Sequence, residues 1–293
     1  MTKPTIGFIG LGIMGKPMSK NLLKAGYPLK VFDLNRDAVE EVAAAGASAA
    51  QSVAEAAKDV DILITMLPNS PQVEQVVLDQ DDAVITAVKP GAIVVDMSSI
   101  APLVSKKVGE ALAEKGVIFF DAPVSGGEPK AIDGSLSIMI GGPQKHFEKI
   151  EPVMLTMGAS AVLVGDVGSG NTTKLANQII VACNIAALSE ALILAQEAGV
   201  DGQKVFEAIR GGLAGSTVME AKAPMMLSDN FKPGFRIDLH VKDLNNVVET
   251  ASAIDAPIDL TNVVLEMMKK LQQDGKGALD HSALYQIYED RVK

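Results

Sequence analysis

The sequence predicts an α/β fold in which a doubly wound, mostly parallel sheet is followed by an all-α C-terminal domain. Short apolar runs bounded by turn residues recur through the first half, and helical patterns lie between several of them. This alternation ends near residue 165, and the rest of the chain has helical periodicity. Because 293 residues suffice for two domains, we expect an α/β domain at 1–165 and a helical domain at 166–293.

The first apolar run breaks into a glycine-rich sequence that predicts a strand, a tight turn and a helix. Gly10 permits the turn, Gly12 lets a pyrophosphate approach bare backbone, and Gly15 lets the helix pack closely on the strand. The helix N-terminus then faces the phosphate charge. The sequence therefore predicts a dinucleotide site whose loop consists of Gly10, Leu11, Gly12, Ile13, Met14 and Gly15.

Asp33 ends the second apolar run, LKVFD, and is the expected partner of the adenosine ribose hydroxyls. A carboxylate at this place repels a ribose 2′-phosphate, so NAD is favoured over NADP. Arg36, with Asn35 beside it, leaves NADP open, because the guanidinium would meet a phosphate if Asp33 turned away.

Later apolar runs predict further strands of the sheet at 61–67, 92–97, 117–121, 136–140 and 161–164. Ligands of such sheets bind across the carboxyl ends of the strands. Leu67 and Pro68 after one run, and Ser99 after the next, are therefore candidate cofactor contacts, with ordinary turn chemistry as the alternative.

The sequence DAPVSGG follows the run at 117–121. Ser125, Gly126 and Gly127 offer one hydroxyl and closely approachable amides, which suit a carboxylate or another oxyanion. We expect them to bind the substrate, with a plain loop as the alternative.

A long helix is predicted from about residue 172 to 198, and its first turns carry Lys174 and Asn177 on one face. A lysine in the first turn opposes the helix dipole, and burial disfavours its charged form, so both effects lower the pKa of Lys174. A lysine with a lowered pKa serves as a general acid or base near neutrality. Further helices are expected at 202–210, 217–227, 238–254, 260–273 and 282–292.

Composition limits the kinds of partner. A net charge of -10 and few histidines argue against nucleic acid, anionic membrane and metal as ligands. No run approaches 18 uninterrupted apolar residues, and the chain begins almost directly with a strand, so we expect neither a membrane span nor a signal peptide. The single cysteine, Cys183, is expected to be a buried, inert thiol in a cytoplasmic protein.

Four ordered motifs resemble those of the β-hydroxyacid dehydrogenase family over essentially the whole chain: GFIGLGIMGKPMSKNLLKAG, DAPVSGG, GSGNTTKLANQ and FRIDLHVKDL. The resemblance implies a Rossmann domain followed by a helical domain, assembled as a dimer or tetramer. It implies Lys174 as the catalytic acid/base and Ser125, Gly126, Gly127 and Asn177 as substrate-binding groups. From the sequence alone, Lys242 is either a cofactor contact or a solvent-facing residue. The resemblance implies that it is a cofactor contact. Ser99 stands where relatives often have threonine, which keeps the hydroxyl.

Within the family, three stretches are most similar to members that reduce tartronate semialdehyde (2-hydroxy-3-oxopropionate) to D-glycerate: SGGEPKAIDGSLSIMIGG, AIRGGLAGSTVMEAKAPMM and FKPGFRIDLHVKDL. We therefore expect a small carboxylate-bearing aldehyde or hydroxyacid as substrate. Oxidation of 3-hydroxyisobutyrate is the nearer alternative, and a non-catalytic dinucleotide-binding sensor is the more distant one.

Overall fold

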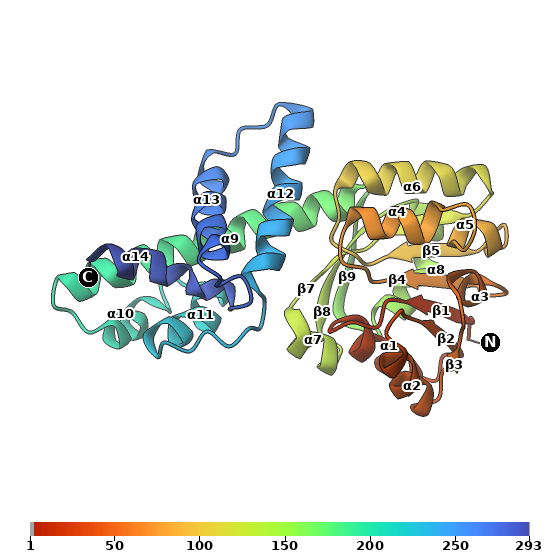
Figure 1. Ribbon diagram of the computed structural model, residues 1–293, viewed down its shortest axis with the longest axis horizontal. Coiled ribbons are helices and arrows are strands. Elements are labelled where there is room, and N and C mark those ends of the chain that lie inside the picture. Colours follow the sequence, from red (N-terminus) through yellow and green to blue (C-terminus); the bar gives the residue numbers. More distant parts are fainter. Residues whose placement is uncertain (1–2, 293) are drawn as a thin grey trace. The chain divides into compact units, whose positions relative to one another are not determined.

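The computed structural model describes residues 3–292. The chain divides between Lys174 and Leu175 into two compact units. The first contains the sheet, and the second is helical (Figure 1). This division lies nine residues beyond the expected boundary at 165, because the long helix begins within the first unit.

Nine strands of the first unit form one sheet within the described residues, in the order β3-β2-β1-β4-β5-β6-β8-β7, with β9 paired to β8. Strands β1 to β6 are parallel to one another, whereas β8 runs antiparallel to β6 and β7 and parallel to β9. The order reverses between β1 and β4, which is where such sheets bind ligands outside the carboxyl ends of their strands. The strands are β1 (Ile6–Ile9), β2 (Leu29–Phe32), β3 (Ser48–Ala49), β4 (Ile62–Thr65), β5 (Ile93–Asp96), β6 (Ile118–Asp121), β7 (Val124–Ser125), β8 (Leu136–Gly141) and β9 (Gly158–Gly165).

Helices cover both faces of the sheet. Alternate residues of one strand belong to different cores: Ile62 and Ile64 pack in one cluster and Leu63 in the other. Helices α4 and α6 lie on one side of the sheet, and α1 and α2 lie on the other (Figure 1). The helices of this unit are α1 (Gly15–Lys24), α2 (Arg36–Ala44), α3 (Val53–Ala57), α4 (Ser70–Leu78), α5 (Val84–Ala87), α6 (Pro102–Glu114), α7 (Gly127–Asp133) and α8 (Gln144–Met154).

The predicted fold class is confirmed. Strands β3 and β7 were not predicted, because each has only two residues, which is too few to show an alternating pattern in the sequence. Strand β9 starts at Gly158, three residues before the predicted run, and its exposed residues weaken the apolar signal there.

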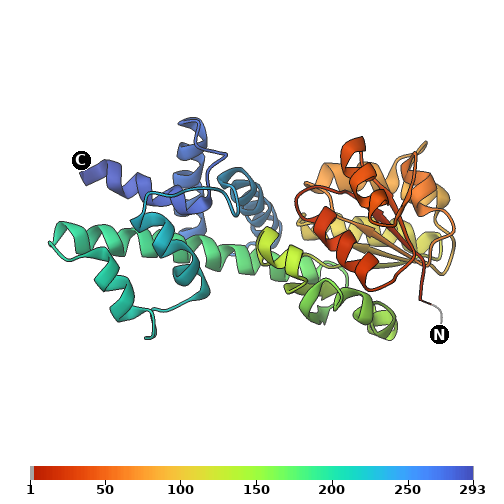
Figure 2. The same ribbon diagram turned by 90° about the horizontal axis from the view of Figure 1, so that it is seen from below.

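The second unit packs its helices around the C-terminal part of α9 (Figure 2). Leu188 and Leu192 of α9 share a core with Leu244, Met268 and Leu284. The helices are α9 (Ser169–Glu197), α10 (Gly202–Ile209), α11 (Thr217–Leu227), α12 (Ile237–Ile254), α13 (Asp259–Gln273), a 3₁₀ helix (His281–Leu284) and α14 (Tyr285–Val292).

Helix α9 is, among the described helices, the one that is long and apolar enough to cross a membrane. In its most apolar stretch, 44% of the residues are buried inside the protein, and the core helix of a soluble protein passes the same test. Cys183 lies on this helix and is half-buried, so it is less buried than expected, and burial raises the pKa of its thiol.

Candidate active site

The glycine-rich loop joins β1 to α1, and its three glycines differ in what surrounds them. Gly10 has φ +99°, and a Cβ there would lie 2.2 Å from the carbonyl oxygen of Met66. A Cβ on Gly15 would lie 1.9 Å from the carbonyl oxygen of Gly10, so the helix packs against the turn. Around Gly12 there is nothing within 4 Å of a Cβ. The two outer glycines meet the chain's own atoms, and the middle one faces open space.

The same loop lines a surface pocket of about 530 Å³. Leu11, Gly12 and Ile13 border it, with Asn35 from the turn after β2. Leu11 is buried and Ile13 is exposed, while Met14 is half-buried just before α1 begins.

The Asp33 carboxylate holds the loop in place. Its Oδ2 accepts from the backbone N–H of Leu11 at 2.6 Å, and its Oδ1 accepts from that of Asn35 at 2.7 Å. Arg36 points elsewhere, because its guanidinium donates to the carbonyls of Ala50 (3.2 Å) and Gln51 (3.3 Å). The geometry thus keeps a carboxylate, and no guanidinium, beside the glycine loop.

A buried carboxyl group, Asp96, organises the ends of β4 and β5. Its Oδ1 accepts from the Thr65 hydroxyl (2.8 Å) and the Ser98 hydroxyl (2.5 Å), and the Ser98 oxygen accepts from the backbone N–H of Leu67 (2.8 Å). Burial raises the pKa of Asp96 to about 7, against the lowering effect of these hydrogen bonds. This network fixes the segments that carry three predicted residues: Leu67 and Ser99 are half-buried, and Pro68 is exposed.

The sequence after β6 differs from the expected loop. Val124 and Ser125 form the short strand β7, with Ser125 opposite Ser137 of β8. Gly126 and Gly127 follow at φ +140° and +70°, conformations that favour glycine, and α7 begins there. The half-buried Ser125 hydroxyl and the two glycines are therefore adjacent, as an oxyanion site requires.

Lys174 lies on α9 and is buried, with 6% of its surface exposed. The prediction that it occupies the first turn is wrong: α9 begins at Ser169, so Lys174 is the sixth residue and lies in the second turn. Two glycines obscure this start in the sequence, but the Asp121 carboxylate accepts from the backbone N–H groups of Gly168 and Asn171 and caps the helix. The helix dipole acts mainly within the first turn, so its expected effect on Lys174 is weaker at this position.

In the second unit, a polar chain joins Asn177 to Lys242. The half-buried Asn177 donates from Nδ2 to Gln178 Oε1 (2.8 Å), and Gln178 donates from Nε2 to Asp243 Oδ2 (2.6 Å). Lys242 Nζ pairs with Asp243 Oδ1 at 2.8 Å. These two predicted residues are therefore brought into one network through buried residues that were not predicted.

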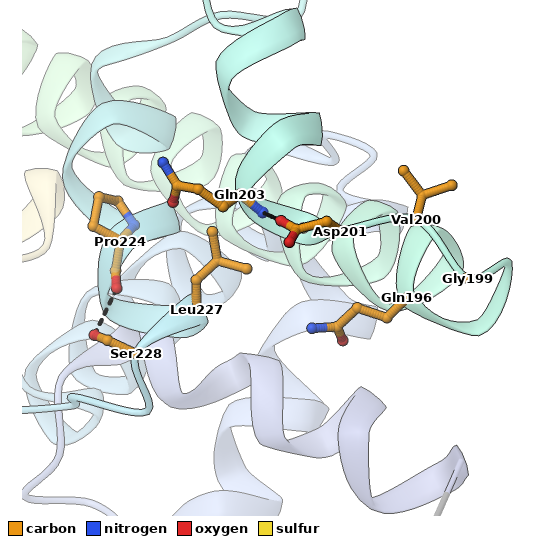
Figure 3. A pocket seen from close by; sticks show the side chains of 9 residues that line it. Gln196, Gly199, Val200, Asp201, Gln203, Pro224, Leu227 and Ser228 are labelled. Atoms are coloured by element: carbon orange, nitrogen blue, oxygen red, sulfur yellow. Dashed lines mark hydrogen bonds between the residues drawn. The ribbon is translucent and has the colours of Figure 1, made fainter.

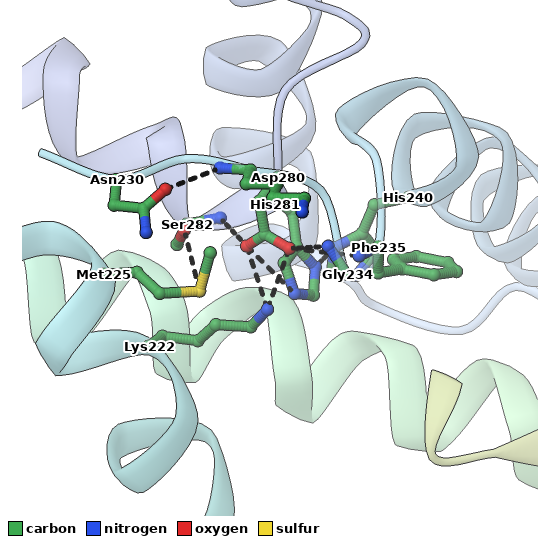
Figure 4. A network of polar contacts seen from close by, with 10 residues as sticks. Lys222, Met225, Asn230, Gly234, Phe235, His240, Asp280, His281 and Ser282 are labelled. Carbon is green, nitrogen blue, oxygen red and sulfur yellow. Dashed lines mark hydrogen bonds and ion pairs between the residues drawn. The ribbon is translucent and has the colours of Figure 1, made fainter. Parts of the chain in front are cut away.

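A second network fixes the segment that leads into α12 (Figure 4). The fully buried Asp280 carboxylate pairs with Lys222 Nζ at 2.9 and 3.0 Å. It also accepts from the backbone N–H groups of Gly234 and Phe235. His281 and His240 lie alongside, with their Nδ1 atoms 2.9 Å apart, although 41 residues separate them. Burial opposes ionisation of Asp280, but the neighbouring His281 and Lys222 lower its pKa to about 2.

A pocket of about 690 Å³ lies at the C-terminal end of α9, bordered by Gln196, Asp201, Gln203 and Ser228 (Figure 3). None of the predicted site residues lines it. Gln196 is 22 residues beyond Lys174, about 33 Å along the helix. Within residues 3–292, no three His, Cys, Asp or Glu side chains converge as metal ligands would.

Sequence reasoning missed Asp96 and Asp121 as organising residues. They lie opposite each other on β5 and β6, at the last position of the similar runs IVVD and IFFD. An aspartate that ends two neighbouring buried strands was the available signal, because a carboxylate there must find donors in the adjoining loops.

Two family models together match nearly the whole chain. The model described as the NAD binding domain of 6-phosphogluconate dehydrogenase matches residues 5–165. The model described as NAD-binding of NADP-dependent 3-hydroxyisobutyrate dehydrogenase matches residues 168–288.

Similar proteins cover the chain at full length. The 2-hydroxy-3-oxopropionate reductase of Escherichia coli (strain K12) is 42% identical over 97% of both chains. The 2-(hydroxymethyl)glutarate dehydrogenase of Eubacterium barkeri is 39% identical over 97% of this chain and 94% of its own. The structure of Mycobacterium tuberculosis 3-hydroxyisobutyrate dehydrogenase with L-serine is 31% identical, with a TM-score of 0.91 over 98% of this chain and 99% of its own.

Proposed function

Because this chain belongs to the β-hydroxyacid dehydrogenase family and uses a nicotinamide dinucleotide, we propose that it reduces tartronate semialdehyde to D-glycerate with NADH. The proposed substrate is supported by the 42% identity, over 97% of both chains, to a 2-hydroxy-3-oxopropionate reductase. A buried lysine at the start of α9 supports the chemistry, since reduction of an aldehyde needs a proton donor as well as a hydride.

The residues of the glycine loop fit a dinucleotide. The open space at Gly12 admits a pyrophosphate beside bare backbone, and α1 begins directly after it, so its N-terminus faces the phosphate charge. Leu67, Pro68 and Ser99 are the proposed contacts on the nicotinamide side. When bound, the reduced cofactor supplies the hydride that is transferred to the aldehyde carbon.

Lys174 is the proposed general acid. As negative charge develops on the aldehyde oxygen, the Lys174 Nζ gives up a proton to it, and the primary alcohol forms without a free alkoxide. In the reverse direction neutral Lys174 removes the hydroxyl proton. A positioned acid of this kind contributes about 10²- to 10⁴-fold in rate.

The substrate carboxylate is assigned to the Ser125 hydroxyl and the amides of Gly126 and Gly127. Backbone N–H groups at positive φ values hold an anion without a bulky side chain in the way. Asn177, three residues after Lys174 on the same helix, is the proposed second anchor. Lys242 is the proposed further cofactor contact.

We assign NADH as the preferred cofactor because Asp33 lies beside the loop and the Arg36 guanidinium is bound to two carbonyls. A 2′-phosphate would meet the carboxylate and would have to draw Arg36 from those carbonyls. Asp33→Ala should therefore weaken NADH binding far more than NADPH binding, measured by fluorescence titration. Equal losses would contradict this assignment.

The substrate is tested by following NADH oxidation in the purified protein with tartronate semialdehyde and with methylmalonate semialdehyde, the aldehyde of 3-hydroxyisobutyrate. Each assay is repeated with NADPH. A higher kcat/KM for tartronate semialdehyde supports the proposal. A higher value for methylmalonate semialdehyde overturns the substrate but keeps the reaction class, and tight NADH binding without turnover of either aldehyde indicates a sensor.

The role of Lys174 is tested with Lys174→Ala, which should lower kcat at least 100-fold while NADH binds normally. Lys107→Ala is the matched control, because Lys107 is 65% exposed on α6 and forms a surface ion pair with Glu74. Retention of more than a tenth of the wild-type turnover by Lys174→Ala would show that another group supplies the proton.

We further propose a cytoplasmic homodimer or homotetramer in which the helical unit carries the contacts between subunits. Ile180 and Leu194 on α9 are 60% and 72% exposed, so two large apolar side chains of this helix are available for a contact between subunits. Analytical ultracentrifugation would test the assembly, because a monomer at micromolar concentration contradicts it. Cell fractionation would test the compartment.

A further inference from the structure

Helix α9 begins against the buried end of β6. Asp121, the last residue of this strand, accepts from the backbone N–H of Gly168 through Oδ1 and from that of Asn171 through Oδ2, both at 2.7 Å. The first N–H groups of a helix have no partner within it, and here a carboxylate 47 to 50 residues earlier in the chain supplies two acceptors. The position of the helix start is thereby set by the sheet.

The side chain of Asn171 fixes the same turn from a second direction. Its Oδ1 accepts from the backbone N–H of Ile100 at 3.1 Å, and its Nδ2 donates to the hydroxyl of Ser105 at 3.0 Å. Asn171 and Ser105 are fully buried. Because its backbone is bound to β6 and its side chain to the β5–α6 segment, Asn171 cannot slide along the helix axis or rotate about it without losing hydrogen bonds.

Close packing around Gly170 prevents the first turn of α9 from moving slightly to compensate for a lost hydrogen bond. A Cβ on Gly170 would lie 2.4 Å from the Asp121 carbonyl oxygen, 2.6 Å from that of Met139 and 2.9 Å from the Gly141 nitrogen. The first turn of α9 is therefore in direct backbone contact with β6 and β8. Backbone atoms cannot move aside as a flexible side chain can.

Lys174 follows Asn171 by three residues, and each helical residue adds about 1.5 Å of rise and about 100° of rotation. A small displacement of the helix start therefore also displaces the Nζ atom of Lys174. Displacing a reacting group by about 1 Å can cost about 100-fold in rate. We propose that Asp121 and Asn171 are positioning residues that set the location of Lys174 for proton transfer. This inference rests on the proposed role of Lys174.

The main test is Asp121→Asn, which replaces one acceptor oxygen by an NH₂ group facing a backbone N–H. We expect kcat with tartronate semialdehyde and NADH to fall about 10- to 100-fold, with the Kd of NADH unchanged within threefold. Ser52→Ala is the matched control, because Ser52 caps α3 through the N–H of Glu55 and has no link to α9 in the hydrogen bonds described. Wild-type kcat in Asp121→Asn overturns the proposal.

A double variant separates this inference from the proposed function. If Asp121 acts through Lys174, then Asp121→Asn adds less than a threefold loss in a Lys174→Ala background. A further tenfold loss there would show that Asp121 acts by another route. If Lys174→Ala itself keeps its activity, the proposed function fails, whereas an inactive Lys174→Ala with a fully active Asp121→Asn refutes only the positioning role.

The pH profile supplies a readout that general loosening of the fold would not give. Burial raises the pKa of Asp121 to about 6, against the lowering effect of the backbone N–H groups of Asn171 and Gly168. Asp96 lies opposite it on β5, and the Lys106 side chain of α6 lies beside Gly168. Protonation removes an acceptor, so wild-type kcat should decline as pH falls through about 6, and this decline should be absent in Asp121→Asn. An identical acid limb in both proteins overturns the assignment.

Should Asp121→Asn fail to fold, Asn171→Leu provides the same test, because it keeps the number and branching of the side-chain heavy atoms and removes the bonds to Ile100 and Ser105. A drop in kcat of at least tenfold, with normal NADH binding, is expected. An unchanged kcat contradicts the proposal.

Discussion

Replacing Lys222 by methionine should destabilise the second unit far more than breaking an exposed ion pair. Lys222 Nζ lies 2.9 and 3.0 Å from the two oxygens of Asp280, and the side chains are 13% and 0% exposed. Lys222→Met keeps most of the length of the side chain and removes the ammonium group that pairs with the buried carboxylate, leaving His281 as its neighbouring cation. Removing one partner of a buried pair costs about 3–5 kcal/mol.

For Lys222→Met we expect a loss of stability near the lower end of this range, about 3 kcal/mol. Asp280 retains three backbone donors, the N–H groups of Gly234, Phe235 and Ser282, which compensate part of the loss. A change of about 3 kcal/mol corresponds to about a 100-fold rise in the population of the open form. Lys107→Met, which breaks an ion pair exposed at 65% and 33%, should cost less than about 1 kcal/mol.

Hydrogen exchange resolved by mass spectrometry measures this effect separately in each unit. Amides of α12 should lose about 100-fold in protection in Lys222→Met, while those of the first unit's sheet stay unchanged and serve as the internal reference. A loss below threefold in α12 would refute the reasoning.

The acid sensitivity of the second unit gives an independent check. Because the folded pKa of Asp280 is lowered from 3.8 to about 2, the group contributes stability that is present above pH 4 and lost as pH falls toward 2. Acid unfolding of the second unit in this window should be shallower in Lys222→Met, because the pKa of Asp280 is then lowered by His281 and the backbone donors alone. An unchanged slope would mean that Lys222 does not stabilise the carboxylate.

Three further outcomes are expected. Gly170→Ala should lower the free energy of unfolding of the first unit by about 1–3 kcal/mol, because its Cβ would overlap backbone atoms of β6 and β8, as urea denaturation would show; no loss would mean that the strands yield. Ser52→Ala should cost about 1 kcal/mol in the same assay through loss of the α3 cap, with kcat unaltered. Arg36→Ala should leave the ratio of NADH to NADPH affinity within threefold of wild type by fluorescence titration, since its guanidinium is bound to carbonyls; a large shift would show that Arg36 reaches the cofactor.

The elements with a strong local signal could be predicted from the sequence. The loop from Gly10 to Gly15 has the expected strand before it and helix after it, since glycine spacing and apolar runs are local properties. The helix from Thr217 to Leu227 has the bounds that were predicted, because Ser216 caps it through the N–H of Met219.

Features that depend on distant residues could not be predicted in the same way. The start of α9 at Ser169 depends on the Asp121 carboxylate, and the sequence near it contains glycines that normally weaken a helix. The contact between His240 and His281 arises from tertiary packing, because 41 residues separate them. Local patterns carry no information on such pairs, so the networks that fix the site became visible only in three dimensions.

The contrast among the three loop glycines bears on how mutations at them would be tolerated in a population of variants. Side chains at Gly10 and Gly15 overlap the protein's own backbone, so variants there should be lost in a screen that scores cellular abundance. A side chain at Gly12 meets no atom, so such variants should accumulate normally and disappear only when growth depends on activity. A screen for abundance and a selection for activity would therefore distinguish the two glycines that the fold requires from the one that is proposed to face the ligand.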